Sequence, residues 1–123
     1  MKSEITQEMA FACYETAKEI YPNRDLINDS ARKIESKTDM NYESARDYLR
    51  NFFFMRDGEK MEHDMSGRDT CFYFECIQRD YGNDALKKAL YSLQLYLALE
   101  QVNHPGLQKI LNGFYELLEK EKS

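Results

Sequence analysis

Two histidines and a few neighbouring acids are the residues of this chain best suited to acid–base chemistry. His63 lies between Glu62 and Asp64, and His104 precedes a proline. Within residues 59–65, Met61, His63 and Met65 alternate with charged side chains. This is the period of an extended strand, so the imidazole would point away from both neighbouring carboxylates. The sequence also lacks the GxSxG, GxxxxGK[ST], GxGxxG and HExxH motifs. We therefore expect no enzymatic activity and no cofactor.

Metal chemistry has little support in the sequence. Acidic residues gather around residues 59–65, but their order does not match a calcium-binding loop. The three cysteines, Cys13, Cys71 and Cys76, have neither CxxC nor zinc-finger spacing. We expect three free thiols and no metal site. An enzyme with a carboxylate-only metal site stays an alternative, which binding of a divalent cation would reveal.

One helix carries side chains that suit DNA. Residues 23–36 and 41–57 are expected to be two helices joined by a short polar turn, which is the layout of a helix-turn-helix. On the second of them, Arg46 and Arg50 are four residues apart and share a face, and Asn51 is expected to point outward beside them. Arginine and asparagine are the side chains best shaped for guanine and adenine edges.

Basic residues around this hairpin could hold the DNA backbone. Lys37, Arg56 and Lys60 are the expected phosphate contacts. Glu43 and Asp47 lie on or beside the face of Arg46 and Arg50 and would repel phosphate. A hairpin with a charged outer face is also ordinary in a small helical domain, so a purely structural role stays open.

The elements that position these residues are helical almost throughout. Apolar residues recur every three or four positions, and caps mark the boundaries. Thr6, Asn23 and Asn41 are expected N-caps. Ser66 opens a further helix in capping-box spacing with Asp69, and Gly82 ends that helix. We expect an all-α single domain over residues 1–123. It would have about six helices, namely 6–21, 23–36, 41–57, 66–81, 84–103 and 105–118, with a loop, short wing or dimer edge at 59–65.

Composition excludes several classes of protein. The 123 residues carry 17 basic and 22 acidic side chains, a net charge of −5, which argues against a protein that coats nucleic acid. The mean hydropathy of −0.74 and the lack of a long apolar run argue against a membrane span. Sixteen aromatic residues and two prolines argue against disorder. The first eight residues are polar rather than signal-like, so we expect a cytoplasmic protein.

Several short segments together are similar to a known family. They are residues 41–52 (NYESARDYLRNF), Gly58, residues 73–77 (YFECI), residues 80–82 (DYG) and residues 86–97. Over roughly residues 10 to 99, the chain resembles a helical domain of bacterial proteins that often precedes an HNH-type nuclease domain in restriction-like endonucleases. The resemblance implies a DNA-related accessory or target-sensing domain. It does not extend to cleavage, because neither histidine has the asparagine and second histidine of an HNH motif.

Two functional hypotheses follow from the sequence. The first is a non-catalytic domain that binds or targets duplex DNA through the hairpin, weakly and with steep salt dependence, since seven basic and six acidic residues lie between Arg32 and Lys60. The alternative is a homodimeric protein–protein interaction module. It would use residues 61–65 or the surplus apolar stripe of the last two helices.

Overall fold

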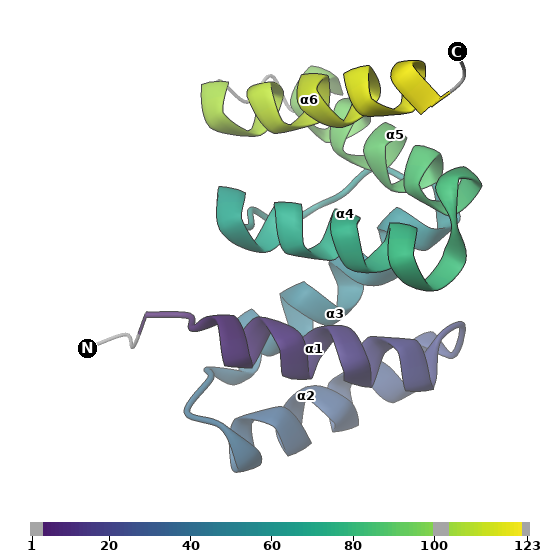
Figure 1. Ribbon diagram of the computed structural model, residues 1–123. Helices are drawn as coiled ribbons and strands as arrows, with labels where there is room; N and C mark the ends of the chain where they lie inside the picture. The colour runs from purple at the N-terminus through teal and green to yellow at the C-terminus, as the bar shows by residue number, and fades with distance from the viewer. Residues whose placement is uncertain (1–3, 100–103, 122–123) are drawn as a thin grey trace. The chain divides into compact units, whose positions relative to one another are not determined.

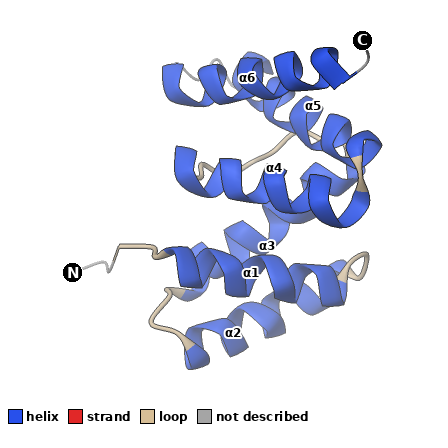
Figure 2. Cartoon of the chain, viewed as in Figure 1, coloured by secondary structure: helices blue, strands red, loops and turns tan. Residues whose placement is uncertain are grey.

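The computed structural model describes residues 4–99 and 104–121, and they form an all-helical fold (Figures 1 and 2). No strand occurs in these residues, so the prediction of an all-α fold with six helices is confirmed. The elements are α1 (Gln7–Ile20), a 3₁₀ turn η1 (Arg24–Leu26), α2 (Ile27–Lys37), α3 (Tyr42–Asp57), α4 (Gly67–Tyr81), α5 (Asn83–Leu99) and α6 (Pro105–Glu121). The part of the predicted fifth helix at residues 100–103 lies outside the described residues. None of the described helices is long and apolar enough to cross a membrane.

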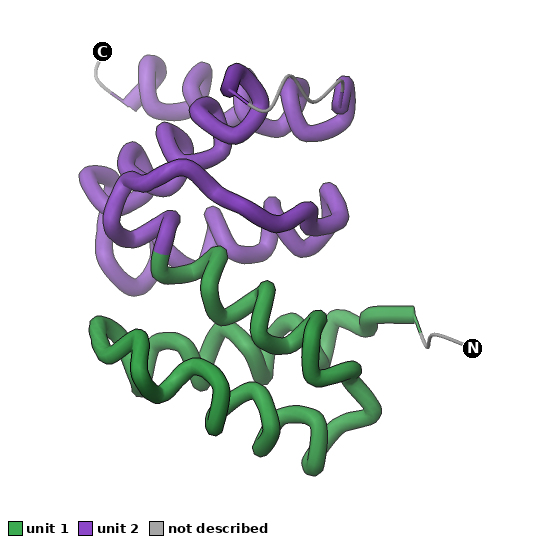
Figure 3. The backbone as a smooth tube through the Cα atoms, turned by 180° about the vertical axis from the view of Figure 1, so that it is seen from behind, with its two compact units in different colours: residues 1–53 green, residues 54–123 purple. Residues whose placement is uncertain are grey.

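The chain divides into two compact units, Met1–Phe53 and Phe54–Ser123 (Figure 3). Helix α3 contributes its first three turns to unit 1 and its last turn to unit 2. The expectation of a single domain over residues 1–123 stays a prediction.

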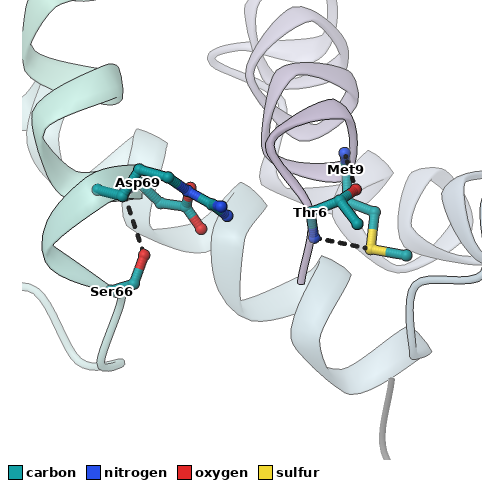
Figure 4. Close-up of polar contacts among 5 residues, drawn as sticks. Thr6, Met9, Ser66 and Asp69 are labelled. Atoms are coloured by element: carbon teal, nitrogen blue, oxygen red, sulfur yellow. Dashed lines mark hydrogen bonds and ion pairs between the residues drawn. The ribbon is translucent and has the colours of Figure 1, made fainter. Parts of the chain in front are cut away.

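Unit 1 is built on α1 and α2, which lie side by side (Figure 1). Thr6 caps α1 as predicted: its Oγ1 accepts the N–H of Met9 at 3.2 Å, and its own N–H donates to the Met9 sulfur at 3.4 Å (Figure 4). The predicted Asn23 cap is replaced by η1, and the Asn23 side chain makes no capping hydrogen bond there. The buried stripes of the two helices are Met9, Ala10, Cys13, Tyr14 and Ala17 on α1, and Ile27, Ser30, Ala31 and Ile34 on α2.

Aromatic rings of α3 pack against Tyr14 on α1 and against Tyr21, the residue that follows α1. The Tyr14 and Phe52 rings meet edge to face with centroids 5.4 Å apart, and Tyr21 packs in the same way on Phe53 at 5.1 Å. Such edge-to-face pairs are a favourable arrangement of buried aromatic rings. The inward residues of α3 are Ala45, Tyr48, Leu49 and Phe52, which are all buried.

A four-residue turn joins α2 to α3. The Thr38 hydroxyl donates to the Ile34 carbonyl at 2.8 Å and accepts the N–H of Met40 at 3.1 Å, which closes the end of α2. The Asn41 side-chain oxygen accepts the N–H groups of Glu43 and Ser44 at 2.8 and 3.4 Å, so Asn41 caps α3 as predicted. Asn41 therefore satisfies two of the N–H groups that have no partner within α3.

Unit 2 packs α4, α5 and α6 against one another. Ser66 caps α4 by accepting the N–H of Asp69 at 3.1 Å (Figure 4), and Gly82 ends this helix with φ +91°, both as predicted. Phe74 on α4 and Phe114 on α6 meet edge to face at 5.3 Å. Leu117 on α6 is 53% exposed, whereas Leu107, Leu111 and Leu118 on the same helix are buried.

The connection at residues 58–66 is a loop, one of the three forms expected for residues 59–65, and it carries no strand. The alternation in its sequence still has a physical basis, because Met61 and Met65 are buried while Glu62 and Asp64 are exposed. The Met61 N–H donates to the Ser92 carbonyl at 3.3 Å, and the Tyr96 hydroxyl donates to Asp64 Oδ1 at 2.6 Å. The loop is thus fixed to α5 at two points.

Candidate nucleic-acid interface

Two arginines from different helices approach the same aromatic ring in unit 1. The guanidinium carbon of Arg32 on α2 lies 3.8 Å from the centre of the Tyr42 ring, and that of Arg46 on α3 lies 5.7 Å from it. Both distances are within the range of cation–π attraction. Tyr42 therefore orients two cations, one from each helix of the α2–α3 hairpin.

Glu35 contacts both Tyr42 and Arg32 at this site. Its Oε2 accepts the N–H of Tyr42 at 3.1 Å, and its Oε1 lies 3.5 Å from Arg32 Nη1. One carboxylate thus caps the first turn of α3 and partly neutralises Arg32. Since the Arg32 side chain remains 65% exposed, it is still accessible to a ligand.

Arg46 has an acidic neighbour on its own helix. Its Nε lies 3.8 Å from Asp47 Oδ1, and the two side chains are 35% and 30% exposed. A pair of this length and exposure is weak and screened by salt. Arg46 is therefore oriented by Tyr42 and Asp47 together, and it does not project into solvent as a lone cation.

Arg50 lies one helical turn beyond Arg46 and lines a pocket of about 230 Å³. The other lining residues are Arg24, Ile27, Asn28 and Phe53. The Arg24 guanidinium carbon lies 5.9 Å from the centre of the Phe53 ring. The pocket is therefore lined by two cationic side chains, one amide and two apolar side chains.

These contacts define a line of four arginines where η1 and α2 meet α3. We call Arg24, Arg32, Arg46 and Arg50 the arginine seam. Sequence reasoning missed the contributions of Arg24 and Arg32. The signal was the spacing of Arg24, Asn28 and Arg32, which are four residues apart each time and so can follow one side of a helix.

The prediction that Asn51 points outward is wrong, because its side chain is 0% exposed. The residues that follow it, from Phe52 to Met55, are also all buried. Four consecutive buried residues cover every side of one helical turn, so α3 is enclosed here and has no outer face. The run FFFM in the sequence was the available sign.

The other predicted phosphate contacts lie away from the arginine seam or in the other unit. Lys37 is on α2, five positions after Arg32 and therefore about 140° around the helix axis. Arg56 and Lys60 belong to unit 2, where the Arg56 guanidinium carbon lies 3.7 Å from the centre of the Tyr81 ring. Of the six residues predicted to contact DNA, only Arg46 and Arg50 lie together on the seam.

Metal-binding and nucleophilic groups do not gather into a site in the described part of the chain. Within residues 4–99 and 104–121, no group of three or more His, Cys, Asp or Glu side chains is placed to hold a metal ion. Cys13, Cys71 and Cys76 are free thiols, as predicted. Partial burial, with a smaller contribution from the Glu75 carboxylate, raises the pKa of Cys71, which makes this thiol a poor nucleophile at neutral pH.

Comparisons with known proteins add no assignment to this geometry. No protein-family model matches the chain, and no curated protein or solved structure matches it.

Proposed function

We propose that this chain is a non-catalytic domain that binds duplex DNA by its phosphate backbone, through the arginine seam. The observation that supports this best is the convergence of Arg32 and Arg46 on the Tyr42 ring. Guanidinium groups held in place by an aromatic ring lose less conformational freedom when they bind a phosphate than free side chains do. Arg50 and Arg24 extend the cationic line from there.

The surface fits contact with the DNA phosphates better than recognition of the base edges. Asn51, the residue best suited to an adenine edge, is buried, and Arg46 lies beside Asp47. The proposed domain therefore binds DNA with little sequence preference. The resemblance to domains that precede HNH nucleases suggests a targeting role in a restriction or nuclease system, in which another protein or domain supplies the cleavage.

Fluorescence anisotropy with a labelled duplex, at about 50 mM and about 200 mM salt, tests the proposal. The variant is Arg32→Ala with Arg46→Ala, and the control is Lys87→Ala, an exposed cation on α5 in unit 2. We expect the double variant to weaken binding roughly tenfold at low salt and to lower the salt slope by about 2, because each phosphate contact contributes about 1. Absence of binding at low salt, or equal affinities for the double variant and the control, would refute the proposal.

A homodimeric interaction module is a second candidate, supported by an exposed apolar stripe on α5. Tyr91 is 47% exposed and Leu99 66% exposed, and Leu95 lies between them at four-residue spacing on the same face. Residues 61–65 do not supply such a surface, because Met61 and Met65 are buried. Light scattering on the wild type and on Leu99→Glu tests this candidate, which predicts a dimer that the charge dissociates. A wild-type monomer at high concentration would exclude it.

A further inference from the structure

The pocket at the end of the arginine seam has features that the seam as a whole lacks. Arg24 and Arg50 approach it from different elements, η1 and α3, and Asn28 adds an amide from the first turn of α2. The positive end of the α2 dipole is therefore beside the pocket as well.

The charge and size of this pocket fit a phosphate monoester. A monoester carries about −1.5 to −2 charges at pH 7, whereas each backbone phosphodiester carries only one. Guanidinium groups suit such a ligand, because their planar N–H forks match phosphate oxygens and each such hydrogen bond is charge-assisted. A volume of about 230 Å³ gives the group room to enter, and Asn28 adds an uncharged hydrogen-bond donor beside the apolar side chains of Ile27 and Phe53.

We propose that this pocket binds the 5′-phosphate at the end of a nucleic-acid strand, and that the rest of the arginine seam holds the phosphodiesters that follow. The second half of this statement rests on the proposed function, whereas the pocket itself does not. The position of the pocket favours a strand end. Arg50 lines the pocket, and Arg46 and Tyr42 lie one and two helical turns away from it along α3. A terminal phosphate in the pocket would therefore place the following phosphodiesters along the seam.

The test compares a short thymine oligonucleotide with and without a 5′-phosphate, titrated into the full chain and followed by calorimetry and by the NMR signal of the Asn28 side-chain amide. We expect the phosphorylated strand to bind at least about tenfold more tightly and to shift the Asn28 signal. Arg24→Ala, a change at an exposed residue, should abolish this preference. Arg32→Ala is the matched control, because it should weaken both strands equally and leave the preference intact.

The outcomes separate this inference from the proposed function. Equal affinities for the two strands, or a preference that survives Arg24→Ala, would overturn the pocket assignment while duplex binding through the seam could stand. Inorganic phosphate that binds as tightly as the phosphorylated strand would overturn the strand-end assignment. A preference for the phosphorylated strand without any binding of duplex DNA would support the pocket and refute the proposed function.

Discussion

The guanidinium of Arg32 stacks on the ring of Tyr42, with 3.8 Å between the guanidinium carbon and the ring centre. This contact joins α2 to the first turn of α3, and Arg46 approaches the same ring. Tyr42 is thus the residue that orients two of the four seam arginines.

Replacement of Tyr42 tests whether this orientation matters for DNA binding. Tyr42→Ala removes the ring that orients Arg32 and Arg46, and ordering each side chain again on binding costs about 0.5–1.5 kcal/mol. We therefore expect duplex affinity to fall at least about 5-fold. Tyr42→Phe keeps the ring and should bind like the wild type. Anisotropy at low salt measures both variants, and an equal loss for Phe and Ala would contradict the role of the ring.

The hydrogen bond from Tyr96 to Asp64 should stabilise the 58–66 connection. Its oxygens are 2.6 Å apart, and Tyr96 is only 7% exposed. Tyr96→Phe should lower the free energy of unfolding by about 1 kcal/mol in a urea titration. Tyr91→Phe, a change of the same kind at a 47% exposed ring on the same helix, should alter it by less than about 0.5 kcal/mol. Similar effects for the two variants would show that the bond to Asp64 contributes nothing.

Two glycines should respond in opposite ways to alanine. Gly82 has φ +91°, where a side chain is strained, although its Cβ would meet no atom within 4 Å. Gly82→Ala should therefore cost more than about 1 kcal/mol through the backbone alone. Gly113 lies inside α6, also with nothing within 4 Å of its Cβ, so Gly113→Ala should stabilise the protein by about 0.5–1 kcal/mol. Thermal unfolding of both variants checks the signs, and a shared sign would contradict this interpretation.

Cys71 should react slowly with iodoacetamide near pH 8. Partial burial and, to a smaller extent, the Glu75 carboxylate raise the pKa of this thiol, so less of the reactive thiolate is present than in a free cysteine. Glu75→Gln removes the negative charge, lowers the pKa of Cys71 and should speed alkylation. Glu116→Gln, the same change on α6, is the control. Mass spectrometry after timed labelling gives the rates, and equal rates for Glu75→Gln and the wild type would exclude the carboxylate as a cause.

Four of the helix ends were determined by the sequence alone. Thr6, Asn41, Ser66 and Gly82 cap or end their helices as predicted. These signals are local, because a capping side chain meets backbone groups only two or three residues away. The spacing of apolar residues likewise sets which face of each amphipathic helix is buried.

The candidate site was decided by tertiary structure. Periodicity places Asn51 beside Arg50, but it does not show that packing encloses α3 on all sides at that point. The arginine seam joins Arg24 and Arg32 to Arg46 and Arg50 across two helices, and the 58–66 connection folds as a loop because it bonds to Ser92 and Tyr96 on α5. Local sequence specifies backbone hydrogen bonds over a few residues, whereas the neighbours of a side chain from distant segments depend on how the helices pack, and no single segment encodes that packing.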